Sequence, residues 1–397
     1  MMAKMGVGDI RGLVDLTPGF NGKTEDSFID ALAIRGIVTN DFGIGGDPSV
    51  AIFTDGVWAG RTGGVQMAFY DMWRAEVVKG PQSTLFGRNA VGGVINVITS
   101  KPTDELSVTA EISGGNEGFA RYAGLVSGPI TENLLGKISF AHREHDGYLD
   151  NIVLGKEQQD EDNDSIRGQL LFTTDLSEWL LSADYMEDDR EDMGRLPIAS
   201  PSSGTDTVQI WIDGGGEFGT VLAPVDGGSD RESGGISLTA NIEFESGTLT
   251  SITAYRNAET DWQMASIGVA RNGSEVIDNI QEEIDTYSQE LRWSSSLSGP
   301  INYVAGLYYM QEDTDRNEAF ELWFAGGMPG ATGPFALFGN EISNQSNEST
   351  SYAAYIQGDY EFNEQWTLTL GARYTYDEKE TESTSVDCGN LPAGFEG

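Results

Sequence analysis

From residue 105 onward, apolar and polar side chains alternate along the chain in repeated stretches of about ten residues. In the first stretch, Leu106, Val108 and Ile112 alternate with polar residues such as Thr109 and Glu111. A period of two places successive side chains on opposite faces of a β-strand. About ten residues is also the length of a tilted strand that crosses a bilayer. The pattern therefore predicts a series of amphipathic strands with one lipid-compatible face.

About eleven strands of this kind can be read from the sequence. They cover 106–113, Ala120–Ser127, Leu134–Arg143, Ile166–Thr174, Trp179–Glu187, Ile236–Glu245, Leu249–Arg256, Thr286–Ser294, Tyr303–Gln311, Ser351–Phe362 and Trp366–Tyr376. In the stretch that begins at residue 286, Tyr287, Leu291 and Trp293 mark the lipid face. Glu290 and Arg292 must then point into the lumen of a barrel.

The predicted connections between these strands alternate in length. Short turns are expected near residues 128–129, 174–178, 246–247, 297–300 and 363–365, and long polar loops over 146–165, 188–235, 257–285 and 312–350. Short turns on one side and long loops on the other are typical of an outer-membrane β-barrel. Aromatic residues also fall near strand ends, where interfacial girdles are expected: Trp179, Tyr185, Trp293, Trp366, Tyr374 and Tyr376.

A different, glycine-rich pattern precedes the strands, between Tyr70 and Pro102. A strand signal over 75–78 is closed by the turn pair Gly80-Pro81, and a second strand is expected over 94–98. Glycines stand between them at 87, 92 and 93, which fits a backbone with positive φ or one that approaches another segment closely. The Gly-x-x-x-x-Gly-Lys-Ser/Thr pattern of a phosphate-binding loop is absent. The local pattern alone also permits an ordinary glycine-rich hairpin in a soluble β-protein.

The order of motifs in this stretch resembles the plug-domain signature of TonB-dependent outer-membrane receptors. The matching residues are Arg74, Glu76, Val77, Gly80, Pro81, Leu85, Gly87, Ala90, Gly92, Gly93, Ile95, Asn96, Lys101 and Pro102. Phe86 replaces a Tyr that is usual in the family, and Trp73 stands where an acidic residue is more common.

Three earlier segments also resemble parts of the family's plug. Residues 10–16 resemble its short helix ahead of a Pro-Gly turn. Arg35-Gly36, within a strand expected over 33–38, match its Ile-Arg-Gly motif. Asp55-Gly56 match its Val-x-x-Asp-Gly-Val motif.

The resemblance implies a mainly β fold with two parts. An N-terminal α/β plug domain over residues 1–103 would lie inside a transmembrane antiparallel β-barrel, and residues 104–397 would supply roughly eleven of about 22 strands. A signal peptide and the family's short TonB-binding box are not found, so truncation at both ends is expected. A half-barrel is expected to form a curled open sheet around the plug and not to insert into a membrane as a monomer.

The function that the resemblance implies is active uptake of a scarce solute across a Gram-negative outer membrane. Ferric siderophores are the commonest substrates in the family, and cobalamin or saccharides are alternatives. The implied partners are the TonB–ExbB–ExbD energy-transducing complex and outer-membrane lipid, and a full-length receptor is expected to be a monomer. A passive porin or a secreted β-rich binding protein is the alternative from another class. A porin has no N-terminal plug, and a soluble binder needs no loops sorted by length.

Charge separates the two parts of the chain. The net charge is -40. The first 102 residues carry 9 basic and 10 acidic side chains, and the remaining residues carry 14 and 53. Such acidity argues against a nucleic-acid partner, although it can equally mark a solubility or saline-habitat bias. It also favours a neutral, cationic or metal-complexed solute over a strongly anionic one. No run of eighteen apolar residues occurs, so a transmembrane helix is excluded.

Potential metal ligands occur in two groups. His142 and His145 are the only histidines, and residues three apart on a strand point to opposite faces, which makes a joint site poor. Asp160, Asp162 and Asp164 have the odd spacing of a calcium loop, but its central Gly and closing Glu are absent. A solvated loop face is predicted there instead, and no metal site.

No catalytic constellation stands out. Cys388 is the only cysteine, so no intramolecular disulfide can form, and its role stays open. A Gly-x-Ser-x-Gly elbow is absent, and carboxylates are too abundant for any pair to be singled out. The sequence therefore predicts a protein that is not an enzyme and needs no cofactor.

The plug is expected to be held in the barrel by ion pairs. Arg35 and Arg74 lie inside plug motifs, and in the resembling family plug arginines pair with lumenal glutamates. Glu290 is the expected partner because its strand alternation points it to the lumen. Glu243 and Glu245 are the alternatives.

Overall fold

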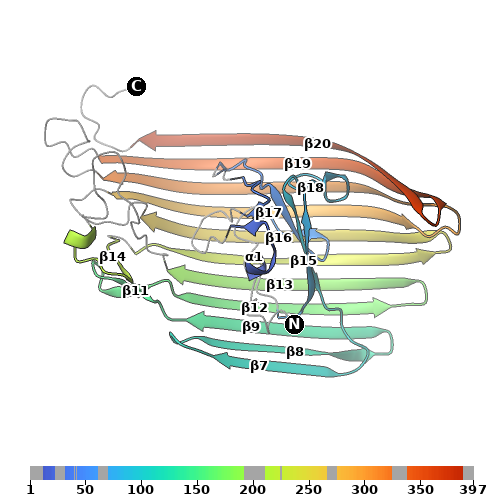
Figure 1. Cartoon of the computed structure of the whole chain (residues 1–397), viewed down its shortest axis with the longest axis horizontal. Helices are drawn as coiled ribbons and strands as arrows, with labels where there is room; N and C mark the ends of the chain where they lie inside the picture. Colours follow the sequence, from blue (N-terminus) through green and yellow to red (C-terminus); the bar gives the residue numbers. More distant parts are fainter. Residues whose placement is uncertain are drawn as a thin grey trace.

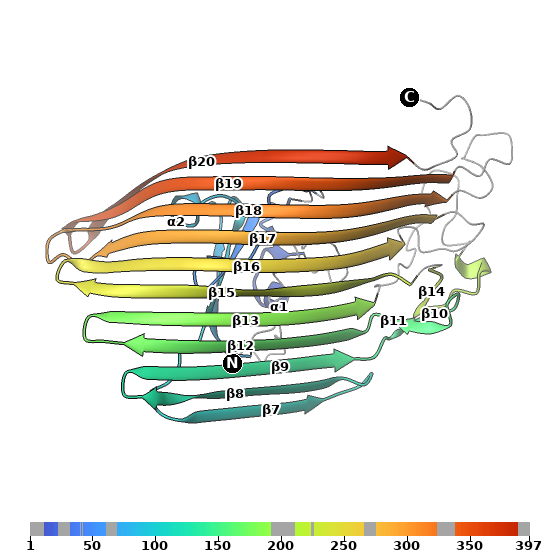
Figure 2. The same ribbon diagram turned by 180° about the vertical axis from the view of Figure 1, so that it is seen from behind.

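The computed structural model describes residues 12–22, 32–39, 41, 43–60, 70–191, 211–223, 226–265, 275–323 and 338–387. A small N-terminal plug packs against one face of a large antiparallel sheet (Figures 1 and 2). The sheet curves around the plug, since strands far apart in it contact the plug: Lys137 near one edge bonds Asp71, and Lys379 at the other edge bonds Asp47.

The large sheet contains the eleven strands that the alternation predicts, each antiparallel to its neighbours. They are β7 (Ser107–Gly114), β8 (Ala120–Thr131), β9 (Leu134–His145), β12 (Glu161–Thr173), β13 (Ser177–Glu191), β15 (Gly228–Phe244), β16 (Gly247–Ala265), β17 (Glu275–Ser295), β18 (Ile301–Trp323), β19 (Phe338–Asn363) and β20 (Trp366–Asp387). They follow one another in sequence order, with β7 and β20 at the two edges. The prediction of a curled open sheet is confirmed.

The two faces of the sheet differ as the alternation predicts. On β9, Ile138 and Phe140 are exposed on the outer face, whereas Lys137, Ser139 and Ala141 are buried against the plug. An apolar outer face suits lipid, and a polar inner face suits a lumen. None of the described helices is long and apolar enough to cross a membrane.

The strands extend further than predicted at the end with the long connections. Most of the residues predicted as loops over 257–285 and 312–350 belong to strands, and so do parts of 146–165 and 188–235. The outer face of these extensions is acidic: Asp189, Asp230 and Asp261 lie directly opposite one another on β13, β15 and β16. The polar–apolar alternation therefore ends while the backbone pairing continues. Asp162 and Asp164 are likewise in β12, so the prediction of a loop there was wrong.

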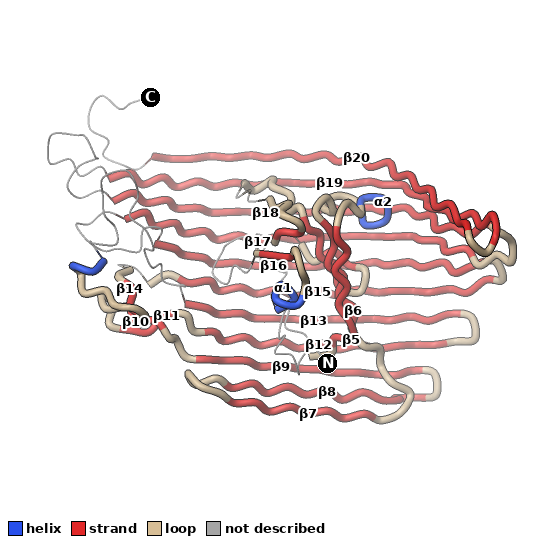
Figure 3. The backbone as a smooth tube through the Cα atoms, in the orientation of Figure 1, coloured by secondary structure: helices blue, strands red, loops and turns tan. Residues whose placement is uncertain are grey.

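The plug is a small α/β unit. Its elements are α1 (Gly12–Leu16), β1 (Phe20–Asn21), β2 (Ala33–Ile34), β3 (Val50–Thr54), β4 (Val57–Trp58), β5 (Met72–Lys79), α2 (Ser83–Phe86) and β6 (Gly93–Thr99). Four of the strands form a sheet in the order β4-β3-β6-β5, with β3 and β6 parallel. Ile34, Ile52 and Ile95 form its core together with Met186 from β13 of the large sheet. The tube view shows the plug strands crossing the long strands (Figure 3).

One local prediction in the plug needs correction. The strand expected over 33–38 ends at Ile34, because Arg35 and Gly36 form a turn with φ of 54° and 78°. The residues after the Gly80-Pro81 turn, for which no element was predicted, form the short helix α2. A further small sheet joins β10 (Leu149–Asn151), β11 (Lys156–Gln158) and β14 (Thr220–Val221) within the first two long connections. Cys388 lies outside the described residues.

Candidate functional site: the plug–barrel interface

The most deeply buried link between plug and large sheet is a Lys–Asp pair. The Lys137 ammonium on β9 donates to Asp71 Oδ2 at 2.6 Å, and both side chains are 0% exposed. Lys137 also donates to the backbone carbonyl of Ser100, directly after β6. Burial makes each charge dependent on the other, because removing one partner leaves an uncompensated charge in a water-excluded site. Lys137 therefore ties the residues just before β5 and just after β6 to the large sheet.

A second link is a chain of alternating charges that starts at the Asp-Gly turn of the plug. Asp55 accepts hydrogen bonds from the Thr99 backbone N–H at 2.9 Å and the Thr99 hydroxyl at 2.7 Å. Arg167 on β12 lies 3.5 Å from Asp55 Oδ2 and 3.4 Å from Asp184 Oδ1. Arg256 on β16 completes the chain, 3.0 Å from Asp184 Oδ2. Asp55 of the plug thus contacts β12 directly through Arg167. Asp184 and Arg256 extend the chain of charges to β13 and β16.

Motif glycines lie where the plug backbone meets the sheet. Gly56 has a φ of 83°, and a Cβ there would approach Ile252 of β16 to 2.9 Å. Gly87 also has a φ of 83°, and a Cβ there would approach the Arg373 guanidinium of β20 to 2.7 Å. Glycine is favoured at both positions for two reasons: the backbone has a positive φ, and a Cβ atom would be too close to the sheet. This confirms the expectation of positive φ or close approach at Gly87.

Two further links join the plug to β19 and β20. Lys379 donates to Asp47 Oδ2 at 2.8 Å and to the Gly45 carbonyl at 2.7 Å. Arg88, which follows α2, donates to Ser349 Oγ at 3.1 Å. Together with Lys137 on β9 and Arg167 on β12, these contacts join the plug to strands near both edges of the sheet.

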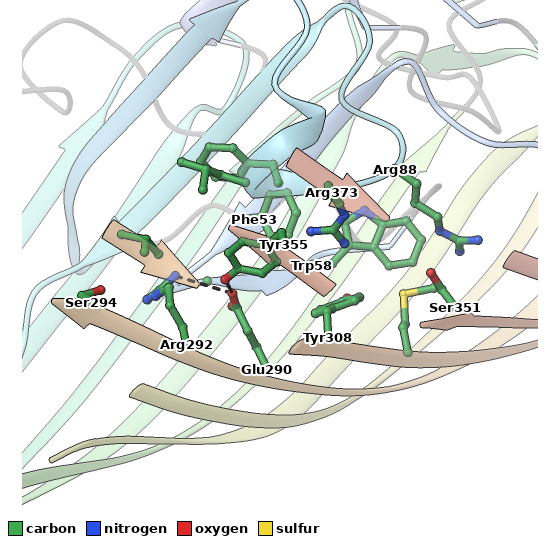
Figure 4. A pocket seen from close by; sticks show the side chains of 15 residues that line it. Phe53, Trp58, Arg88, Glu290, Arg292, Ser294, Tyr308, Ser351, Tyr355 and Arg373 are labelled. Atoms are coloured by element: carbon green, nitrogen blue, oxygen red, sulfur yellow. Dashed lines mark hydrogen bonds and ion pairs between the residues drawn. The ribbon is translucent and has the colours of Figure 1, made fainter. Parts of the chain in front are cut away.

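A cavity of about 360 Å³ separates the plug from strands β17–β20 (Figure 4). Phe53 and Trp58 line it from the plug, and Glu290, Tyr308 and Tyr355 line it from the sheet. The Tyr355 hydroxyl donates to Glu290, which Figure 4 shows pointing toward the plug. The plug therefore contacts the last four strands around the margins of this cavity, through Arg88 and Lys379 among others.

The comparisons with known proteins identify the family. Residues 160–393 match the family described as TonB dependent receptor-like, beta-barrel. Residues 1–94 match the TonB-dependent Receptor Plug Domain.

The chain belongs to the TonB-dependent receptors. This family places it in the Gram-negative outer membrane, with the plug seated on the lumenal face of the barrel strands.

Relatives of the receptor cover it to different extents. A pesticin receptor of Yersinia pestis is 24% identical over 388 residues, which is 96% of this chain and 52% of the relative. A ferripyoverdine receptor of Pseudomonas aeruginosa is 34% identical over 151 residues, 38% of this chain and 18% of the relative. The chain thus spans about half the length of the pesticin receptor.

Solved structures share the fold. The ferric yersiniabactin uptake receptor FyuA from Yersinia pestis superimposes with a TM-score of 0.80 at 20% identity, over 98% of this chain and 57% of FyuA. The ferric citrate transporter FecA superimposes with a TM-score of 0.70 at 12% identity, over 96% of this chain and 56% of FecA.

The receptor does not bring together the predicted arginine–glutamate partners. Arg74 Nε donates to Glu76 Oε1 at 2.6 Å, and Glu76 accepts from Asn96 at 3.3 Å, so these three motif residues form a partly exposed cluster of their own on β5 and β6. Arg35 is exposed at its turn. Glu290 faces the lumen as predicted but bonds Tyr355.

The two alternative partners also lie elsewhere. Glu243 accepts from Thr248 at 2.8 Å beside a short turn, and Glu245 is exposed in that turn. The prediction of an Arg35 or Arg74 pair with any of these glutamates is therefore not met in this structure. The motif pair Gly80 and Gly92 has a simpler role: the Gly80 N–H donates to the Gly92 carbonyl at 2.9 Å and closes the hairpin. Gly93 lies beside the carbonyl of Val78, too close for a Cβ.

Sequence reasoning missed Lys137, Arg167 and Asp71. A signal was available for the first two, because each is a cation at a lumen-facing position of an alternating strand, next to apolar lipid-facing residues. Asp71 carries no such signal, since it precedes its strand.

The two histidines point to opposite faces, as predicted. His145 Nε2 lies 3.5 Å from the buried Glu161, whereas His142 Nδ1 lies 3.1 Å from Asp164 on the outer face. Among the described residues, His142, Asp162 and Asp164 form a group with metal-ligand spacing, with the two aspartates exposed. Exposed groups of this kind are common without a metal, so the group carries no assignment.

Proposed function

We propose that the receptor imports a ferric siderophore across the outer membrane, with work supplied by the TonB–ExbB–ExbD complex. The observation that carries the proposal is a plug fixed across the lumenal face by buried charges, above all Lys137 with Asp71. A passage blocked in this way requires work on the plug before a bulky solute can pass. The names of several relatives support iron as the cargo: ferripyoverdine and ferric aerobactin receptors are among them.

The proposal extends to domain division and assembly. The plug is proposed to cover residues 1–103 and the barrel residues 104–397, a boundary that falls between β6 and β7. The receptor is proposed to act as a monomer in outer-membrane lipid and without enzymatic activity.

The test is uptake of radioactive iron. A receptor that carries this plug and these strands in a closed barrel is expressed in a Gram-negative host that lacks its own siderophore receptors, and a panel of ferric siderophores is offered. We expect uptake of one class of chelate, and its loss when the host's tonB gene is deleted. Uptake of cobalamin or a saccharide without iron would mean that this solute, and not a ferric siderophore, is the cargo. Uptake that is independent of TonB and unselective for size would indicate a porin and overturn the proposal.

A further inference from the structure

The cavity between the plug and strands β17–β20 carries an excess of positive charge. Arg88, Arg292 and Arg373 line it, and Glu290 is the one carboxylate among its lining residues. The whole chain carries a net charge of -40. A local excess of cations in so acidic a chain needs a specific explanation. Three guanidinium groups within one partly enclosed space favour a negatively charged occupant.

The hydrogen-bonding capacity of these arginines is only partly used. Arg88 Nη1 donates to Ser349 and lies 3.9 Å from Asp377 Oδ1, whereas Arg88 Nη2 is buried and has no hydrogen-bond partner within the described part of the chain. Arg292 Nη1 lies 3.8 Å from Glu290 Oε1, beyond hydrogen-bond distance, and Tyr355 already donates to that oxygen. Arg373 donates through Nε to Thr375 at 3.0 Å, which leaves its two Nη groups facing the cavity region (Figure 4). Arginine presents a planar fork of donors that matches a carboxylate.

The remaining walls are aromatic. The Arg373 guanidinium lies 5.9 Å from the ring of Tyr308 and 5.4 Å from that of Tyr355. Phe53 and Phe86 of the plug pack with their ring centroids 5.5 Å apart on the opposite side. A planar ring can stack on such walls while an anionic substituent reaches the arginines. The volume of about 360 Å³ is enough for a single substituted ring.

We propose that this cavity is an inner binding site for an aromatic carboxylate on the cargo or its chelating arm. The inference deepens the proposed function and rests on it for the identity of the cargo. It also refines the expectation from net charge: acidic strands discourage free anions at long range, whereas the cavity binds one at short range. The site lies between the plug and strands β17–β20.

The test is equilibrium binding of benzoate to a receptor that carries these strands in a closed barrel, purified from outer membranes into detergent and titrated by saturation-transfer NMR. Benzamide has the same shape without charge, and cyclohexanecarboxylate has the charge without the ring. We expect benzoate to bind about tenfold more tightly than either control, as expected for one charge-assisted contact or one stacked ring.

The variant Arg292→Gln tests whether the arginines bind the carboxylate. Arg292 is 37% exposed on its side chain and its ion pair with Glu290 is long, at 3.8 Å, so we expect the variant to keep the fold. We expect about a tenfold loss of benzoate affinity and no change for benzamide. The matched control is Arg143→Gln on β9, whose side chain is 30% exposed and lies across the sheet from the cavity. It should leave benzoate binding unchanged.

Equal affinity for benzoate and benzamide would overturn the inference, and so would an equal loss in the Arg292→Gln and Arg143→Gln variants. The readout is independent of transport. Iron uptake without benzoate binding removes the inner site and leaves the proposed function standing. Benzoate binding in a receptor that imports no iron supports the inner site and overturns the proposed function.

Discussion

At the scale of single residues, the buried pair of Lys137 and Asp71 is the contact on which the plug depends most. Replacing Lys137 by Met leaves a carboxylate buried without its cation, at a cost of ~3–5 kcal/mol. We therefore expect Lys137→Met, in a receptor that carries these strands in a closed barrel, to loosen the plug and to raise the passive ion conductance in planar bilayers. The double variant Lys137→Met/Asp71→Leu should recover most of the loss, because both charges are gone.

The control for this prediction is Lys101→Met. Lys101 also joins the plug segment to the sheet through a carboxylate, Glu178, but its side chain is 54% exposed. An exposed pair contributes about 0–1 kcal/mol, so conductance should stay low. Equal conductance in the Lys137→Met and Lys101→Met variants would contradict the dependence on burial.

Asp278 gives a prediction for pH. It lies on the extension of β17 beyond the apolar band, where burial, assisted by the Glu318 carboxylate and opposed by Arg316, raises its pKa to about 6. A raised pKa means that the folded state favours the protonated form. The stabilisation is present at low pH and is lost as the pH rises through about 6. Amide exchange on the extensions of β17 and β18 should therefore show lower protection at pH 8 than at pH 5, after correction for intrinsic rates.

Asp278→Asn is the matched variant, since it keeps the shape and removes the titration. Its protection in β17 and β18 should be nearly independent of pH over that range. A wild-type difference that persists unchanged in Asp278→Asn would assign the effect to other groups.

At the scale of elements, the extended strands carry rows of carboxylates in register. Asp189, Asp230 and Asp261 face one another across three strands. Like charges directly opposite one another destabilise a sheet. Burial, and then the negative charges of Glu232 and Asp261, raise the pKa of Asp230. The raised pKa means that the charged form of Asp230 is disfavoured there, in agreement with repulsion between the carboxylates. We expect Asp230→Asn to stabilise the β15–β16 extension by ~0.2–1 kcal/mol at neutral pH.

This gain should shrink at high ionic strength, because salt screens exposed charges. Hydrogen exchange of the β15 and β16 amides in low and high salt measures it. A destabilised Asp230→Asn variant would mean that the carboxylate has a favourable partner.

The strands show where sequence reasoning works and where it stops. Alternation located all eleven strands and oriented Glu290 correctly, because one face must meet lipid. It missed the extensions, where the outer face is as polar as the inner face and the period of two disappears. It also named the wrong partner for Glu290, because the depth at which a plug side chain meets the wall depends on packing. No local pattern records that depth.

At the scale of the whole molecule, the sheet has two edges, β7 and β20, that no described strand pairs. Each unsatisfied backbone group in hydrocarbon costs several kcal/mol. We expect the 397-residue chain alone not to refold into liposomes as a monomer that resists protease. Protease protection and gel mobility after refolding measure this. A stable single channel from one copy of the chain would contradict it.

The link between Lys379 and the plug joins residues 334 positions apart, since Lys379 bonds the carbonyl of Gly45. Synthesis completes the plug long before β20 exists. The contact therefore closes a loop of more than three hundred residues and can form only after nearly the whole described chain has left the ribosome. Contacts of such long sequence separation slow folding, so we expect the junction of β20 with the plug to be among the last contacts that the chain makes.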